Sequence, residues 1–385
     1  MKYILFRMKR FCGFITGFIF FISGILKLMD PVGAGLVMKE YFKFLHLGFL
    51  EFTAPAAGFI FAFAEAILGA GLITGAWKRI MAQVAIALQA FFTLLTLLLV
   101  IFQPEMDCGC FGEAVHLSHG ETLVKNIIIL TFLLIYYIPR KRLGETKKKK
   151  YVSFGLVTIS VIAFAIYSLL YIPMVDFTDF RPGTLVNSET STSSDNYQVV
   201  FVYEKNGKED TFTLETLPDS TWTFVRSENQ NLAQIEKQPA TISIYDRNGN
   251  YADSLLTEGK SFIISLYKDS ITPREQVQIV KLLDSAAAVG FRPFLLSASV
   301  EIDCDYLYFC DYKTLITLNR SNGGATYMED GYIIRKWAKK ALPDSDGLTM
   351  LSEEDSTDTF IGRDTRSNLA FQGFLLYVFA VMLLL

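Results

Sequence analysis

Two cysteines stand one residue apart in the stretch DCGCFG, residues 107–112, of a chain that has five cysteines in all. A disulfide between Cys108 and Cys110 would close a very small ring, whereas ordinary disulfides join Cα atoms about 4.4–6.8 Å apart. Gly109 tolerates the unusual backbone angles that such a ring needs. Because a strained disulfide is easily reduced, the pair suits thiol–disulfide exchange. A static cross-link, or two thiols in a tight turn, are the alternatives.

A metal site is a competing interpretation of the same region. Its potential ligands are Cys108, Cys110, His116 and His119. Two thiolates and two imidazoles could bind zinc or copper, but this spacing is not a common one among zinc sites. Ser118 and Glu121 form the S-x-x-E signature of a helix start, which makes His119 the first residue of that helix. We therefore assign no metal and keep the four residues as the alternative.

Two charged residues lie within apolar stretches of membrane-spanning length. Glu65 lies roughly 20 Å from the outer end of its stretch, at 1.5 Å per helical residue. An ionisable side chain at that depth indicates a functional site. Alternatively, a protonated Glu65 hydrogen-bonds to Gln89 of the next span. Lys27 could extend to the membrane interface, bind a quinone oxygen or stabilise a cysteine thiolate.

The elements that must position these residues are apolar helices. The chain has 385 residues, 51% of them hydrophobic, and the excess is concentrated in blocks near the length of about 20 residues that a bilayer requires. The final stretch is short, and is either a sixth span or a truncated one. The sequence therefore predicts a multi-pass membrane protein. Its expected spans are 11–28, 52–76, 80–102, 122–138, 151–172 and 371–385.

Lys and Arg cluster at alternate ends of these spans, which sets their orientation. The clusters are residues 2–10, the pair Lys78 and Arg79, and the run 140–150, which also suits anionic lipid headgroups. By the positive-inside rule we expect a protein of the inner (cytoplasmic) membrane with a cytoplasmic N-terminus. The expected first loop (residues 29–51), the DCGCFG loop and residues 176–370 are then periplasmic, in a compartment where disulfides persist.

The polar region after the fifth span has the pattern of an α/β domain. Residues 176–260 are β-rich, with hairpin turns at Asn206-Gly207 and Asn248-Gly249. In 261–345 the expected order is strand, helix, strand, helix, hairpin and short helix. This order is similar to that of the thioredoxin fold.

The active-site residues of a thioredoxin are missing, however. No cysteine occurs in 267–273, where its C-x-x-C would follow the first strand, and Gly324 occupies the place of its cis-proline. The domain is therefore expected to dock or scaffold. Cys304 and Cys310 could pair with each other, exchange with the DCGCFG pair, or be buried in the domain.

The fold class predicted from these patterns is an α-helical membrane bundle with an α/β thioredoxin-like extracytoplasmic domain. No phosphate loop, nucleic-acid patch or Ser-His-Asp set stands out in the sequence. The expected partners are the lipid bilayer and an envelope protein, either a client or a redox partner. The expected segments are a four-helix membrane domain (1–145), a fifth transmembrane helix (151–174), a β-rich segment (176–260), a thioredoxin-like domain lacking C-x-x-C (261–345), a flexible linker (346–370) and a C-terminal span (371–385).

Three stretches carry a resemblance to a known family. SGILKLMDP, AEAILGAGLITG and DCGCFG resemble the MauE branch of the DoxX-like membrane proteins, over about residues 5–140. The extension after the fifth span is similar to a DoxX-family group of Bacteroidetes-type genomes. The resemblance implies a four-helix core linked to redox and disulfide handling. That core is similar in plan to the vitamin K epoxide reductase bundle, which couples cysteines to a quinone.

Two functions follow as hypotheses. In the first, Cys108 and Cys110 cycle between thiol and disulfide, with Lys27 aiding the thiolate and Glu65 handling a proton or stabilising the bundle. A membrane quinone or a partner protein would exchange the electrons. In the second, the protein is a non-catalytic scaffold that binds envelope partners through its inactive thioredoxin-like domain. The first is favoured by the intact C-x-C motif, although an enzymatic activity of the chain's own is left open.

Overall fold

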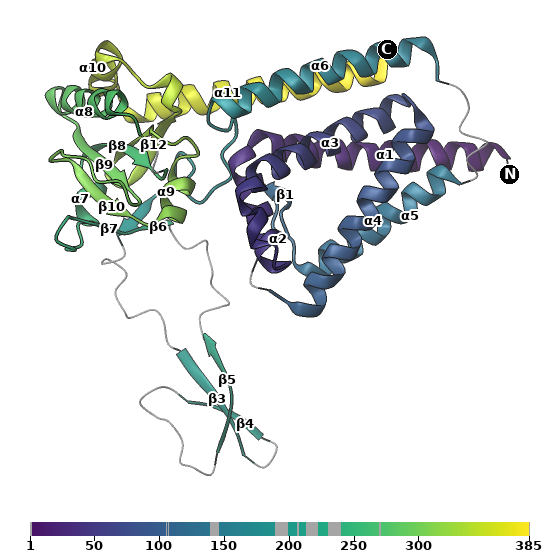
Figure 1. Cartoon of the computed structure of the whole chain (residues 1–385), viewed down its shortest axis with the longest axis horizontal. Coiled ribbons are helices and arrows are strands. Elements are labelled where there is room, and N and C mark those ends of the chain that lie inside the picture. The colour runs from purple at the N-terminus through teal and green to yellow at the C-terminus, as the bar shows by residue number, and fades with distance from the viewer. Residues whose placement is uncertain are drawn as a thin grey trace.

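The computed structural model describes residues 2–104, 106, 108–138, 146–188, 199–205, 208–212, 222–229, 240–268 and 271–384. It has a helical part and an α/β part that contact each other (Figure 1). The expected Asn206-Gly207 turn and most of the basic run 140–150 lie outside the described residues.

Within the described residues, six helices are long and apolar enough to cross a membrane. Each overlaps an expected span. Five of them begin earlier than expected, in more polar residues, whereas α3 is shorter than its expected span at both ends. The chain is therefore a multi-pass membrane protein with a helical core. The helices are α1 (Lys2–Met29), α3 (Ala54–Thr74), α4 (Lys78–Phe102), α5 (His119–Tyr137), α6 (Lys148–Leu170) and α11 (Ser356–Leu384).

Helices α1 and α3 pack closely because glycines lie at their contact. A Cβ atom added at Gly24 would lie 2.3 Å from the backbone nitrogen of Ala66, and one added at Gly69 would lie 2.3 Å from that of Phe21. Small residues allow such approach between helices in a membrane, where dispersion contacts between backbones replace the hydrophobic effect. This contact places Lys27 of α1 beside Glu65 of α3.

The segment 29–51, expected to be a loop, contains helix α2 (Pro31–Phe44) and a short 3-10 helix (Gly48–Thr53). Asp30 caps α2 by accepting a hydrogen bond from the Gly33 amide, and Pro31 occupies its first turn. Both are helix-start signals that were present in the sequence. Helix α2 packs on α3 and on the short strand β1 (Cys110–Glu113), which contains the second cysteine.

The α/β part contains a six-stranded mixed sheet in the order β12-β11-β8-β9-β10-β7. Strands β8, β9 and β10 are mutually parallel, while β11 and β12 are antiparallel to their neighbours. Helices α8 (Pro273–Ala288) and α9 (Tyr312–Leu318) cover opposite faces, because the adjacent β8 residues Ile263 and Ile264 belong to different apolar clusters. The strands are β7 (Ile244–Tyr245), β8 (Lys260–Leu266), β9 (Arg292–Ser297), β10 (Leu307–Cys310), β11 (Gly324–Glu329) and β12 (Tyr332–Trp337).

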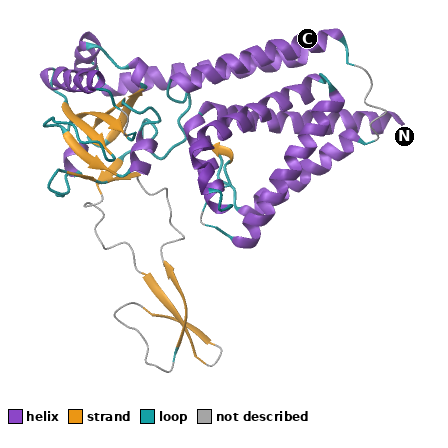
Figure 2. Cartoon of the chain, viewed as in Figure 1, coloured by secondary structure: helices purple, strands orange, loops and turns teal. Residues whose placement is uncertain are grey.

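Two smaller sheets lie before this one in the chain. Strand β2 (Val186–Ser188) pairs in parallel with β6 (Ala240–Ile242). The other sheet has the order β4-β3-β5 and projects away from the rest of the molecule (Figure 2). It consists of β3 (Val199–Lys205), β4 (Lys208–Phe212) and β5 (Thr223–Asn229).

The expected flexible linker 346–370 is helical instead. Asp344 caps α10 (Ser345–Glu353), and the side chains of Leu348 and Leu351 are buried beside α8. Helix α11 then begins at Ser356 and continues without a break through the C-terminal apolar stretch, which makes the sixth candidate span full length. The first half of this helix is polar and lies before the apolar segment, so the composition of the sequence did not indicate a helix there.

Helices α6 and α11, far apart in sequence, lie side by side (Figure 1). The Phe164 and Phe374 rings stack with centroids 4.7 Å apart, and the Ser153 hydroxyl donates to the Val381 carbonyl at 2.7 Å. The α/β domain, whose sequence falls between these two helices, is thus joined to a helix of the membrane part at each of its ends.

Candidate functional site

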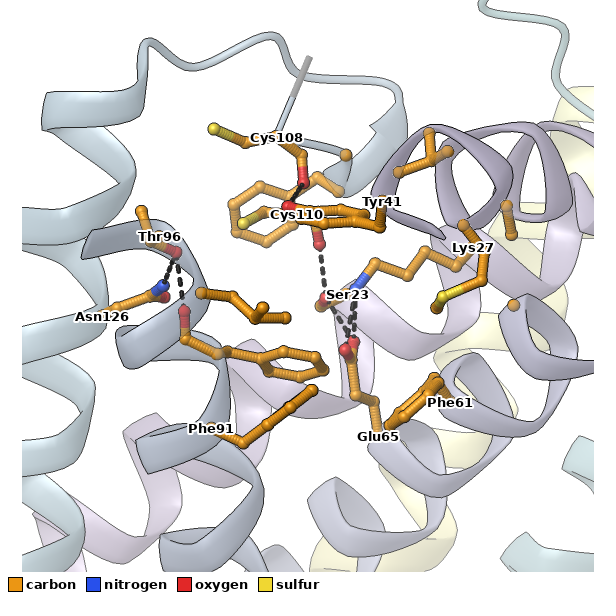
Figure 3. Close-up of a pocket in the computed structure, with 18 of the residues that line it drawn as sticks. Ser23, Lys27, Tyr41, Phe61, Glu65, Phe91, Thr96, Cys108, Cys110 and Asn126 are labelled. Carbon is orange, nitrogen blue, oxygen red and sulfur yellow. Dashed lines mark hydrogen bonds and ion pairs between the residues drawn. The ribbon is translucent and has the colours of Figure 1, made fainter. Parts of the chain in front are cut away.

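An apolar cavity of about 310 Å³ lies among helices α1 to α5, beneath strand β1. Aromatic and aliphatic side chains form most of its wall, including Phe61, Phe91 and Phe92. All four of the residues proposed from the sequence as a redox set, Lys27, Glu65, Cys108 and Cys110, line it (Figure 3). A cavity with apolar walls and a few converging polar groups has the character of a small-molecule site.

One wall of the cavity carries a buried ion pair. The Lys27 ammonium lies 2.7 and 2.9 Å from the two carboxylate oxygens of Glu65, a residue that is 3% exposed. Lys27 therefore does not extend to the interface but folds inward along α1. The ammonium also lies 5.7 Å from the centre of the Phe92 ring, within the range of a cation–π attraction.

Ser23 connects this ion pair to the cysteine loop. Its hydroxyl oxygen lies 2.7 Å from a Glu65 carboxylate oxygen and 2.7 Å from the backbone carbonyl oxygen of Cys110. A hydroxyl has a single hydrogen to donate, so it can serve only one of these two acceptors at a time. Ser23 is one helical turn before Lys27 on α1, so the two side chains reach the same side of the cavity.

The cysteine loop is fixed to the bundle through its backbone. The Tyr41 hydroxyl of α2 donates to the Cys108 carbonyl at 2.9 Å. Gly109 has a φ of +58°, and a Cβ atom there would lie 2.4 Å from Val37 of α2. A glycine is thus required between the cysteines both for its backbone conformation and for its lack of a side chain. Cys108 is buried, Cys110 is half-buried, and no disulfide joins them in the structure.

Tyr41 shares the buried environment of the cysteines. Burial raises the pKa of its phenol, and the nearby side chains of Cys110 and Cys108 raise it further. The phenol therefore keeps its proton at neutral pH and remains a hydrogen-bond donor to the loop. Sequence reasoning did not single out Tyr41 or Ser23, because both become significant only through contacts with residues distant in the chain.

The opposite wall carries a group of neutral polar side chains. Asn126 of α5 donates to the Thr96 hydroxyl of α4 at 2.9 Å, and Gln89 donates to the Asn126 backbone carbonyl at 3.2 Å. All three are buried and line the cavity. The expected bond between Gln89 and Glu65 is therefore wrong: Gln89 bonds across to α5, and Glu65 is occupied by Lys27 and Ser23.

The histidines proposed as alternative metal ligands do not join the cysteines. His119 opens helix α5, as its capping box predicted, and its Nε2 atom lies 2.9 Å from the Met106 carbonyl oxygen. His116 is exposed. Among the described residues, no group of three or more His, Cys, Asp or Glu side chains is arranged to hold a metal ion.

Cys304 and Cys310 belong to the α/β domain and do not line the cavity. Cys310 ends strand β10 with its side chain in the core beneath α9, and is 1% exposed. Cys304 is half-buried, and this burial raises the pKa of its thiol. Neither is joined in a disulfide, and Cys310 and Cys304 each pack against an apolar cluster of the domain.

The fold and the site together define a multi-pass membrane protein in which a C-x-C loop closes over an apolar cavity that holds a few polar groups, within a helical bundle. Residues 3–139 match the family described as methylamine utilisation protein MauE, so the N-terminal region is a MauE-family domain. This confirms the resemblance that the sequence motifs predicted. Residues 197–233 match a family described as a domain of unknown function.

One curated relative is protein TlpB of Flavobacterium psychrophilum. The chain is 26% identical to it over 167 residues, which are 43% of this chain and 45% of that protein. The match thus spans less than half the length of the relative. No solved structure matches the chain.

Proposed function

We propose that the protein is a membrane thiol–disulfide redox protein whose reactive pair is Cys108 and Cys110. Oxidation of the two thiols forms one S–S bond and releases two electrons and two protons. A quinone-type carbonyl compound in the cavity takes them up and becomes the quinol, and the reverse reaction regenerates the thiols. The observation that carries this proposal is that both cysteines line the same apolar cavity as the buried Lys27–Glu65 pair.

Lys27 and Glu65 have complementary roles in this proposal. The Lys27 ammonium can donate to a ligand oxygen and favours a thiolate nearby, which is the nucleophilic form of cysteine. Glu65 neutralises Lys27 in the absence of ligand and can accept a proton. Ser23, which lies within hydrogen-bonding distance of Glu65 and of the Cys110 carbonyl, provides the connection between the carboxylate and the loop.

The two polar walls support a ligand with two carbonyl oxygens. Lys27 and Ser23 would hold one oxygen, and the amide groups of Gln89 and Asn126 the other, with the aromatic walls on the faces of the ring. A buried polar group aligned on a ligand oxygen discriminates strongly against ligands that lack it. We therefore infer a quinone as the ligand class. The other substrate is a protein dithiol, which reduces the Cys108–Cys110 disulfide back to two thiols and itself becomes a disulfide.

The α/β domain is proposed to be a thioredoxin-like domain that has lost its catalytic cysteines. Its support is the sheet order β9-β8-β11-β12, with β8 and β9 parallel and the last two strands antiparallel. The loop after β8 contains no cysteine. We assign the domain a non-catalytic role in docking to the membrane part and to an envelope partner.

We further propose that the cysteine loop and the α/β domain face the periplasm from the inner membrane. Lys78 and Arg79 begin helix α4, whose other end at Phe102 leads into the cysteine loop. The Thr146 hydroxyl, beside the basic start of α6, donates to the Gly75 carbonyl at 2.6 Å. The basic segments before α4 and α6 therefore share one end. By the positive-inside rule this end is cytoplasmic.

The decisive experiment is differential thiol alkylation with mass spectrometry, on membranes equilibrated at potentials from roughly −120 to −270 mV, the range of known exchange proteins. Cys108 and Cys110 should interconvert together within this range, while Cys12 and Cys310 keep one state. The Cys108→Ser and Cys110→Ser variants should each abolish the transition, and Cys304→Ser should leave it unchanged. A pair that keeps one state throughout would refute the redox function and favour the non-catalytic scaffold.

Ligand class is tested separately with a short-chain quinone. The quinone should oxidise the dithiol form of the wild-type protein. This oxidation should be much slower in the Lys27→Met variant. The Cys110→Ser variant should still bind the quinone, measured by displacement of a fluorescent quinone analogue, because the cavity wall remains. Binding that is unaffected by changes at Lys27, Gln89 and Asn126 would contradict the assignment of the quinone to this cavity.

A further inference from the structure

One side chain of the α/β domain contacts both elements that surround the cysteine pair. Arg320 follows helix α9, and its Nε atom donates to Asp30 while its Nη2 atom donates to Glu113, each at 2.9 Å. The arginine side chain is 4% exposed. A buried guanidinium with two carboxylate partners has the geometry for directional, charge-assisted hydrogen bonds.

Each partner belongs to an element that carries a residue of the site. Asp30 caps helix α2, which places the Tyr41 hydroxyl on the Cys108 carbonyl. Glu113 ends strand β1, which begins with Cys110. Gly33 leaves the space for this approach, because a Cβ atom there would lie 2.4 Å from an Asp30 carboxylate oxygen and 3.3 Å from the Arg320 guanidinium.

The arginine is itself held rigidly within the α/β domain. The Tyr267 hydroxyl, in the loop after β8, donates to the Arg320 carbonyl at 2.8 Å. The Arg320 side chain also donates to the Ile316 carbonyl at 3.2 Å. Val32 and Leu36 of α2 pack against the apolar core of the same domain, while other α2 residues line the cavity. Helix α2 is thus shared between the two parts of the molecule.

We propose that Arg320 is a positioning residue for the cysteine pair: it fixes strand β1 and helix α2 together over the cavity, so that docking of the α/β domain sets the reactivity of Cys108 and Cys110. This inference rests on the proposed redox function. Removing the arginine leaves two neighbouring carboxylates without their shared cation, and it removes the contact that holds strand β1 to helix α2. The thiols then become accessible to water-soluble reagents and lose their fixed place beside Lys27.

The test uses the full-length protein in native membranes and a membrane-impermeant maleimide. Arg320→Gln should raise the alkylation rate of Cys110 about tenfold or more, since a tenfold change needs only ~1.4 kcal/mol in the opening equilibrium. It should also shift the midpoint potential of the pair. Arg320→Lys keeps the charge but not the forked geometry, so its Cys110 alkylation rate should lie between those of the wild type and of Arg320→Gln. Arg292→Gln is the matched control, because Arg292 makes an exposed ion pair with Glu258 in the same domain.

Glu113→Gln provides an independent variant that leaves the Arg320–Asp30 contact in place, and it decides the matter if Arg320→Gln does not fold. Glu113→Gln should raise the alkylation rate of Cys110 more than the Arg292→Gln control does. Wild-type rates and potentials in folded Arg320→Gln and Glu113→Gln would overturn the positioning role. A wild-type pair that never interconverts would instead refute the redox function, and the alkylation rates would still report on positioning.

Discussion

The Lys27 ammonium lies 2.7 and 2.9 Å from the two carboxylate oxygens of Glu65, between helices that contact each other through glycines. Each residue alone would be costly within a bilayer, and Glu65 was noted from the sequence for that reason. Their pairing explains how both are tolerated. It also leaves a charged, hydrogen-bonding group at the wall of an otherwise apolar cavity.

Breaking this pair should be more harmful than removing it. Glu65→Gln leaves a buried ammonium without its counter-charge, which costs about 3–5 kcal/mol. The double variant Lys27→Met, Glu65→Met removes both charges and should recover most of that loss, but not the redox activity. The thermal midpoints of the detergent-solubilised wild type, single variant and double variant test this order of stabilities. A double variant no more stable than Glu65→Gln would contradict the ion-pair explanation.

The residue between the cysteines should accept no side chain. Gly109→Ala requires a left-handed conformation, which costs an L-residue roughly 1–2 kcal/mol, and it places a methyl group against Val37. We expect faster alkylation of Cys108 and a lower thermal midpoint. Adding Val37→Ala should relieve the steric part but not the backbone part. Full recovery in the double variant would show that the backbone conformation is unimportant.

The close contact of α1 and α3 should depend on Gly24. In Gly24→Ala the new Cβ atom would lie 2.3 Å from a backbone nitrogen of Ala66, so the helices must separate. We expect a clear loss of thermal stability and weaker quinone binding, because the wall that holds Lys27 and Glu65 moves. Gly155→Ala in α6 is the control, since a Cβ atom there meets nothing within 4 Å. Equal effects of the two substitutions would contradict this role.

The interface of the α/β domain should weaken in acid. Lys336 donates to Asp176 at 2.7 Å, and although burial opposes ionisation, this partner holds the pKa of the Asp176 carboxyl below its ordinary value of 3.8. Ionised Asp176 thus stabilises the folded state above pH 3.8, and that contribution is lost as the pH falls through the lower folded-state pKa.

The substitution Asp176→Asn isolates this contribution. The wild-type protein should have the higher thermal midpoint at neutral pH, and the difference should shrink below pH 3.8, where the wild-type carboxyl takes up its proton. Asp179→Asn, at an exposed position nearby, should follow the wild-type curve. A constant difference between wild type and Asp176→Asn across the pH range would refute the assignment.

Much of the helical part could be predicted from the sequence. The length of an apolar segment and the basic residues that flank it are set by the thickness and charge of the bilayer, and not by contacts with distant residues. The strands and helices of 261–345 were also predictable, apart from β10, a short strand next to loop residues. The C-x-C, Lys27 and Glu65 were recognised by type and depth. Ser23, Tyr41 and Arg320 were not, because ordinary polar residues gain a role only when folding brings them to another segment.

Errors arose where local composition and tertiary packing disagree. The polar stretch before the last span suggested a flexible linker, but helix α11 extends through it. The segment after the first span was expected to be a loop, although Asp30 and Pro31 are good helix-start residues. Gln89 was assigned to Glu65 by depth alone, and the actual rotation of α4 directs it to Asn126.

Because the α/β domain is joined to α6 at one end and to α11 at the other, and these two helices pack on each other, the domain is doubly tethered. Breaking its contacts at Arg320 and Lys336 would release it over a short range only, and re-docking would be intramolecular at a high effective concentration. A soluble partner that competes for the surface around Asp30 and Glu113 must overcome this local excess. Access to the cysteine pair would therefore require a partner whose concentration relative to its dissociation constant exceeds the corresponding ratio for the tethered domain.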